Sequence, residues 1–243
     1  MGWMMTKHYR PEIDGLRAIS VIGVVLFHLE LGFPGGFVGV DVFFVISGYL
    51  ITGILLRQLG EDRFSLMEFW ARRVRRIVPA AIVMVVGALL IGAFLQTPER
   101  YASLARSAMA HVLMASNCYF TRDQGYFAEK SDHEPLLHTW SLSVEEQFYL
   151  IFPLIVCFVW KRAPQRLVLV FTSAALISFS WSWIEVVSNP KWAFFLLPAR
   201  GWELLVGALL AILPQKTMRS LGDEAWAGLG LVLVLAPMFF FDR

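Results

Sequence analysis

The sequence predicts an all-α fold, a polytopic bundle of about seven or eight transmembrane helices. Of its 243 residues, 57% are hydrophobic and only 16% are charged, whereas a soluble domain has about 45–50% and 25%. Seven apolar runs of about 20 residues are long enough to cross a bilayer. These runs lack the period-two alternation of barrel strands, so only helices satisfy their backbone in lipid. The composition excludes most soluble enzymes and disordered proteins.

The predicted helices follow one another along the chain. They comprise residues 15–31, 37–56, 77–95, 140–160, 167–187, 192–213 and 226–241. A further, mixed stretch at residues 104–120 carries Arg106, His111 and Asn117. It either crosses the membrane or forms a re-entrant or interfacial segment, and we favour the second. Because no linker or internal repeat interrupts the series, residues 1–243 are expected to form a single membrane domain.

Arginines between the second and third runs predict the orientation. Residues 57–76 hold six of them, which places this loop in the cytoplasm by the positive-inside rule. The N-terminus, two crossings earlier, then lies on the same side. These arginines are Arg57, Arg63, Arg72, Arg73, Arg75 and Arg76. A re-entrant stretch at 104–120 would keep Lys161, Arg162 and Arg166 inside, whereas a full span would place them outside.

The charge balance argues against nucleic-acid binding, and the cysteine and histidine patterns argue against a metal site. A net charge of +2 gives no general basic field for nucleic acid. Cys118 and Cys157 lie in apolar stretches and are too few for a disulfide framework or a cysteine metal site. The histidines lack the HxH, HExxH and HxxxH spacings, so we expect no metal.

Ionisable residues within the first two runs are candidates for function, because they are energetically expensive in a membrane. Arg17 and His28 are eleven positions apart, which places them on one helix face with about 16 Å of rise between them. Arg17 could instead be a snorkelling anchor, and His28 could make an interhelical hydrogen bond. Asp41 opens the second run, where it either belongs to a site or is stabilised by the helix dipole.

A second group of candidates begins the run at residue 140. Glu145 and Glu146 lie near its start, and His138, Ser141 and Glu145 share one helix face. Two adjacent carboxylates predict a polar cavity.

Five blocks in the chain resemble, in this order, the acyltransferase-3 family of integral-membrane O-acyltransferases. They are residues 9–18 (YRPEIDGLRA), 37–49 (FVGVDVFFVISGY), 69–79 (FWARRVRRIVP), 135–149 (PLLHTWSLSVEEQFY) and 197–207 (LPARGWELLVG). The resemblance implies transfer of acyl groups, most often acetyl from acetyl-CoA, to hydroxyls of bacterial envelope polysaccharides. Such acceptors include lipopolysaccharide O-antigen, capsule, exopolysaccharide and peptidoglycan. The implied location is the bacterial inner membrane, with a polysaccharide or a lipid-linked glycan as acceptor.

The resemblance also implies roles for particular residues. The family's basic residue and histidine with ten positions between them correspond to Arg17 and His28. Its paired arginines correspond to Arg73 and Arg76, although Arg72 and Arg75 have the same spacing. Further polar candidates from the last two blocks are Ser143, Glu145, Glu146 and Gln147, together with Arg200, Trp202 and Glu203.

Elementary chemistry supports an acyl-CoA donor as a substrate rather than a permanently bound cofactor. The donor carries a 3′-phosphate and a pyrophosphate, for which clustered arginines supply bidentate hydrogen bonds. The same arginines could simply be a positive-inside signal. A pantetheine arm of about 15–20 Å would let a thioester reach His28 in the middle of the bundle, where the imidazole acts as general base. Asp41 or Glu145 would orient it.

Two alternatives remain open. A proton-coupled transporter would also use a buried histidine and carboxylates, although it has no need to combine them with the arginine cluster. The chain could also be an inactive fragment or scaffold of the acyltransferase fold. Family members usually have ten or more spans, so we expect this chain to be incomplete at its C-terminus. The resemblance is to a branch often followed by an SGNH-type domain, which this sequence does not contain and which could be a separate or fused partner.

Overall fold

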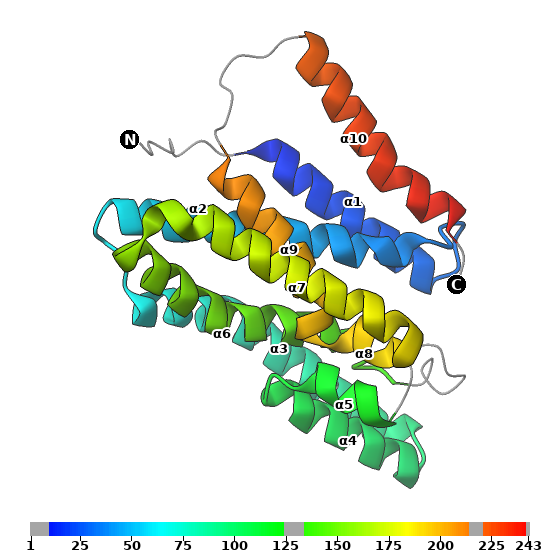
Figure 1. Ribbon diagram of the computed structural model, residues 1–243. Helices are drawn as coiled ribbons and strands as arrows, with labels where there is room; N and C mark the ends of the chain where they lie inside the picture. Colours follow the sequence, from blue (N-terminus) through cyan, green and yellow to red (C-terminus); the bar gives the residue numbers. More distant parts are fainter. Residues whose placement is uncertain (1–9, 124–133, 214–220, 242–243) are drawn as a thin grey trace. The chain divides into compact units, whose positions relative to one another are not determined.

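The computed structural model describes residues 10–123, 134–213 and 221–241, and every regular element in these segments is a helix (Figure 1). The contacts divide the chain into two compact units, residues 1–57 with 203–243 and residues 58–202. The elements are α1 (Pro11–His28), η1 (Gly36–Val38), α2 (Gly39–Gly60), α3 (Leu66–Leu95), α4 (Pro98–Val112), α5 (Ser116–Asp123), α6 (Thr139–Arg162), η3 (Pro164–Arg166), α7 (Leu167–Ser188), α8 (Pro190–Phe195), α9 (Leu197–Ile212) and α10 (Leu221–Phe240).

The all-α membrane fold is confirmed, with six helical segments of the described chain long and apolar enough to span a bilayer. These segments are 36–60, 66–95, 139–162, 164–188, 190–212 and 223–240. The predicted first span is not among them. Its helix, α1, has 18 residues and carries Glu12, Asp14 and Arg17 in its N-terminal half.

Glycines bring the helices of the first unit into close backbone contact. A Cβ on Gly39 would overlap the carbonyl oxygen of Ser20 on α1, and one on Gly48 would overlap that of Leu204 on α9. Gly207 on α9 approaches the carbonyl of Val45 on α2 in the same way. Small residues are what permits helices to pack closely in lipid, where the hydrophobic effect does not drive helix association.

The segment before α2 is tied to α10 within the same unit. The N–H of Gly35 donates a hydrogen bond to the carbonyl of Met238 at 3.1 Å. The Phe33 and Phe239 rings lie 4.5 Å apart. Gly36 packs directly on the Gly23 carbonyl of α1, so α1, η1 and α10 form one packed group.

In the second unit, α3 is longer than its apolar run. The Ser65 side chain caps it by accepting a hydrogen bond from the Glu68 N–H at 3.4 Å. The helix therefore begins eleven residues before the predicted start at Ile77. The prediction that the whole of residues 57–76 forms a loop is wrong, since four of the six arginines lie on the first turns of α3.

Residues 104–120 do not form one continuous helix. They are divided between α4 and α5, which lie side by side in Figure 1 and contact each other. Between them Met114 has a left-handed backbone with φ 56°. At 15 and 8 residues, neither helix reaches the roughly 20 residues that a bilayer requires. This geometry agrees with a re-entrant or interfacial segment.

The predicted span at 192–213 is interrupted near its start. The backbone at Leu196, between α8 and α9, is extended, with φ −92° and ψ 138°. Pro198 lacks a backbone N–H, so it cannot donate to the Phe194 carbonyl as a continuous helix would require, which explains the break. The Ser178 hydroxyl of α7 secures the beginning of α9, because it donates to the Pro198 carbonyl at 2.7 Å and accepts from the Trp202 N–H at 2.9 Å.

Candidate functional site

The residues predicted for the site are divided between the two units of the fold. Arg17, His28, Asp41 and Glu203 belong to the first, and the remaining candidates belong to the second.

Arg17 and His28 lie on one uninterrupted helix, α1, which confirms their separation of about 16 Å along its axis. The Arg17 guanidinium lies 5.5 Å from the centre of the Phe43 ring of α2 and 3.6 Å from the Asp14 carboxylate. These contacts place Arg17 against α2.

His28 is the last residue of α1, and its side chain is exposed next to the Phe27 ring, 5.2 Å away. The expected position in the middle of the bundle is therefore wrong. The hydropathy pattern extended the first run to Leu31, whereas the helix ends at His28.

Two carboxylates complete the first unit's candidates. Asp41 lies in the first turn of α2, as predicted, and is partly buried. Glu203 on α9 is only 1% exposed. A buried carboxylate is rare unless other groups stabilise it, so Glu203 is a polar position of the membrane interior.

The arginine cluster of the second unit separates into side chains with different surroundings. Arg73 is half-buried, with its guanidinium 4.4 Å from the centre of the Tyr149 ring of α6. Arg72 points to Glu68 at 3.2 Å and to Gln58 at 3.4 Å. Arg75 and Arg76 are exposed. Arg73 thus lies against α6, which favours it over its neighbours as a positioned side chain.

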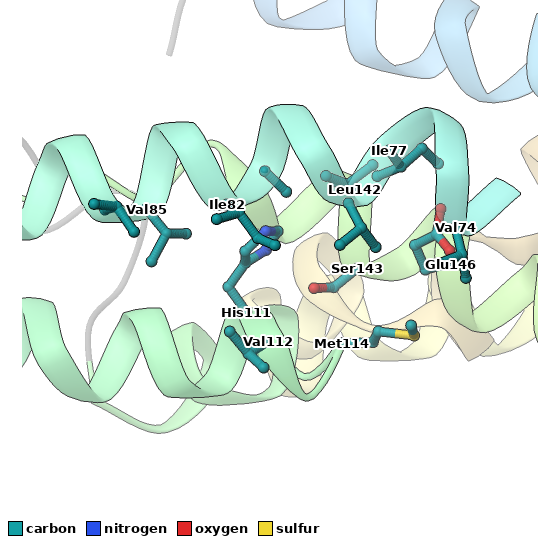
Figure 2. A pocket seen from close by; sticks show the side chains of 13 residues that line it. Val74, Ile77, Ile82, Val85, His111, Val112, Met114, Leu142, Ser143 and Glu146 are labelled. Atoms are coloured by element: carbon teal, nitrogen blue, oxygen red, sulfur yellow. The ribbon is translucent and has the colours of Figure 1, made fainter.

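A cavity of about 300 Å³ lies between α3, α4 and α6 (Figure 2). Its α3 wall is apolar from Val74 to Val86. The opposite walls contribute polar groups, namely His111 from the end of α4 and Ser143 and Glu146 from α6. The prediction of a polar cavity is corrected, because apolar side chains make up most of the lining.

The two adjacent glutamates have different surroundings. Glu146 lines the cavity, and its Oε1 atom is buried without a hydrogen-bond partner among the described residues. The charge of Arg73 acts on this carboxylate. Glu145 is 7% exposed and is not part of the cavity lining. Of the pair, Glu146 is therefore the better-placed candidate for contact with a ligand.

Ser143 and Gln147 attach α5 to α6. The hydroxyls of Ser143 and Ser116 are 2.7 Å apart, and one donates to the other. The Gln147 side-chain amide donates to Asn117 Oδ1 at 2.8 Å and to the Met114 carbonyl at 2.8 Å. These residues of the fourth block hold the helix that carries Glu146, so their first role is to position it.

The other predicted polar residues lie apart from the cavity lining. His138 precedes α6, and its Nε2 atom is 3.1 Å from the Met84 sulfur. The Arg200 guanidinium lies over the rings of Trp140 and Phe194, 5.6 and 5.5 Å from their centres. This cation–π arrangement explains why an arginine is stable at the start of α9.

Sequence reasoning noted His111 but did not assign it to the site. Its ring is buried, and Nδ1 has no hydrogen-bond partner among the described residues. Burial, followed by the charge of His138, lowers the pKa of His111 below its ordinary value. The sequence signal that could have identified His111 as a site residue was its position within the short mixed stretch at 104–120.

The positions of the site residues indicate whether a metal ion or a phosphate could bind. In the described segments, no three His, Cys, Asp or Glu side chains are grouped so that they could hold a metal ion. The arginines at the start of α3 have the chemistry to bind phosphates.

Comparisons with known proteins extend the assignment. The chain is 40% identical over 213 residues to the peptidoglycan O-acetyltransferase OatA of Listeria monocytogenes, covering 85% of this chain and 34% of that protein. It is 35% identical over 249 residues to the O-acetyltransferase OatA of Staphylococcus aureus, covering 98% and 41%. It is 37% identical over 228 residues to the putative peptidoglycan O-acetyltransferase YrhL of Bacillus subtilis, covering 88% and 35%.

The chain thus spans between a third and about two-fifths of the length of these relatives. No solved structure matches it. The profile of one family, described as an acyltransferase domain, matches residues 10–243. Since this match covers nearly all of the sequence and all five blocks apart from Tyr9, the chain belongs to the acyltransferase-3 family.

Proposed function

We propose that this protein is a membrane O-acyltransferase that moves an acyl group, most simply acetyl, from acyl-CoA to a hydroxyl of a cell-wall polysaccharide. The family match over residues 10–243 carries this proposal. The names of the relatives from Listeria and Bacillus favour peptidoglycan over O-antigen as the acceptor. The buried ionisable residues support an enzyme, because such residues are retained in a membrane bundle mainly for function.

The donor's phosphates bind at the start of α3 in this proposal. Arg75 and Arg76 are exposed, so their guanidinium groups can form bidentate hydrogen bonds with phosphate oxygens. Arg73 is held over Tyr149, which fixes its fork before the donor arrives. A fixed side chain loses less conformational entropy on binding than a mobile one.

The acceptor hydroxyl is activated by His28. The imidazole takes the hydroxyl proton as the oxygen attacks the thioester carbonyl, the carbon–sulfur bond breaks, and the products are the ester and the CoA thiol after protonation of the sulfur. The exposed ring is accessible to a large acceptor. Arg17 lies about 16 Å along α1 from His28 and belongs to the same unit.

The orientation follows from the arginines of α3 and the segment before it. With this end of α3 in the cytoplasm, the donor site faces the compartment that holds acyl-CoA. With both α1 and α2 crossing the membrane in this proposal, the N-terminus is cytoplasmic, and the protein lies in the bacterial plasma membrane.

The experiment uses the full-length protein purified in detergent. Acetyl-CoA is added with and without soluble peptidoglycan fragments, and both CoA thiol and acetylated glycan are measured. We expect acceptor-dependent release of thiol and an equal amount of ester. A proton-coupled transporter would yield neither product, and an inactive scaffold could bind CoA without turnover. Either result would refute the proposed activity.

A further inference from the structure

The cavity between α3, α4 and α6 has the form of a slot that runs along α3 (Figure 2). Its apolar wall extends from Val74 to Val86, twelve positions that correspond to about 18 Å of helix. With C–C bonds of about 1.5 Å in an extended zigzag, a chain of roughly 12–14 carbons covers this length. A linear molecule of this length can therefore contact the whole α3 wall.

Two side chains that line this slot each carry a buried polar atom without a hydrogen-bond partner among the described residues. The two atoms are Oε1 of Glu146 and Nδ1 of His111. The third polar group, the Ser143 hydroxyl, already shares a hydrogen bond with Ser116. Because a buried polar group without a partner is unfavourable, a ligand that supplies hydrogen bonds at these atoms stabilises the site.

The charges near the slot restrict the polar end of the ligand. The opposite charges of Glu146 and Arg73 act on each other and so offset one another near the slot. A charged head group of either sign therefore gains too little attraction there to offset the loss of its hydration. A neutral hydroxyl has no such loss. It can donate to the carboxylate, and it can accept from or donate to the imidazole.

The apolar wall restricts the rest of the ligand. A pantetheine arm has two amides, and their four hydrogen-bonding groups would outnumber the polar side chains that line the slot. A hydrocarbon chain has no such requirement. The slot is therefore better suited to an alkyl chain than to the arm of the donor.

We propose that this cavity binds a neutral amphiphile that has a single hydrocarbon chain and a hydroxyl head group. The chain lies against α3 between Val74 and Val86, and the hydroxyl head group donates to Glu146, which lies beside Val74 (Figure 2). In a bilayer the chain gains little from entering the cavity, because lipid tails are as apolar as the wall. Selectivity therefore comes from the head group. The proposal concerns binding alone and does not depend on acyl transfer.

The test uses photoaffinity labelling of the full chain in phosphatidylcholine nanodiscs. The probe is a dodecanol analogue with a diazirine in mid-chain and a terminal alkyne, and labelled residues are mapped by mass spectrometry. Analogues of dodecanoic acid and dodecylamine with the same reactive group serve as matched probes. We expect the alcohol to label residues 74–86 at least tenfold more than either charged probe, and unlabelled dodecanol to compete.

Two neighbouring alanines on α3 provide matched variants. Ala81 lines the cavity, whereas Ala80 is exposed and does not. Ala81→Phe should lower labelling by the alcohol at least tenfold, and Ala80→Phe should leave it unchanged. Glu146→Leu should remove the discrimination between the alcohol and the acid.

Several results would overturn the proposal. They are equal labelling by the three probes in the wild type, absence of labelling or of competition, and equal labelling of the two alanine variants. If Ala81→Phe fails to fold, as judged by size-exclusion chromatography, the comparison of probes and the competition in the wild type still decide.

Discussion

Arg73 and Arg76 are the side chains whose joint removal tests the donor site most clearly. Arg73 is anchored over Tyr149 at 4.4 Å, and Arg76 is exposed on the same helix one turn later. Each charge-assisted hydrogen bond contributes about 1.5–3 kcal/mol, and exposure of Arg76 places its contribution at the low end. Replacement of both by Ala should cost at least about 3 kcal/mol, a roughly 100-fold rise in Kd for CoA.

Replacement of both residues by Lys refines this prediction. Lys retains the charge but lacks the planar fork, so it should restore only part of the affinity. The comparison of CoA with 3′-dephospho-CoA then identifies the contact. If one of the two arginines binds the 3′-phosphate, its Ala variant should bind the two ligands with nearly equal affinity.

Calorimetry on the full-length protein in detergent measures these affinities. The matched control is the double Ala variant of Arg100 and Arg106, two exposed arginines of α4, which should bind CoA as the wild type does. Thermal unfolding confirms that each variant is folded, because Arg73→Ala also removes its contact with Tyr149. Unchanged CoA affinity in the folded Arg73 and Arg76 variant would refute the donor site.

Three further predictions concern packing, protonation and orientation. Gly48→Ala would place a Cβ on a carbonyl of α9 and should lower the free energy of unfolding by about 1–3 kcal/mol. Gly53→Ala has open space around it and should not. Unfolding in detergent measures both variants, and equal effects would contradict the close contact. The pKa of His111 is lowered in the folded state, so the stabilising contribution of its neutral ring is present above about pH 6.5 and is lost as the pH falls. Tm should therefore decrease below that pH. His111→Phe should make this decrease smaller, and an unchanged decrease would contradict the reasoning. In a cysteine-free background, Cys at Glu61 should resist an impermeant thiol reagent in intact cells and Cys at the exposed Leu31 should react; the reverse pattern would invert the orientation.

Hydropathy predicted the membrane class because the apolar runs are long and contain few charges. It placed the start of α3 at Ile77, since the preceding arginines are polar. The missed signal was local, because Ser65 and Glu68 have the spacing of a capping box that begins a helix. A helix can extend beyond the apolar run that it contains, so helix ends require capping signals as well as hydropathy.

The candidate site was predicted less completely, because its geometry depends on contacts between distant segments. The sequence placed Glu145 and Glu146 side by side but did not distinguish them, and only the packing of α3 against α6 puts Glu146 in the cavity lining. His111 was overlooked as a site residue for the same reason. Nothing in its own stretch shows that the end of α4 meets α3 and α6.

The central claim is that His28 activates the acceptor hydroxyl, and glycan acetylation by variants at this position tests it most directly. Membranes that contain the full-length protein with His28→Ala or His28→Gln are supplied with acetyl-CoA and peptidoglycan, and transfer is measured together with CoA binding and protein level. We predict that both variants lose transfer by about 10²–10⁴-fold, because neither side chain can carry the proton, while CoA binding is retained. An interhelical hydrogen bond in membrane proteins averages only about 0.6 kcal/mol, and a His28→Gln variant that keeps most of its transfer activity would contradict the account.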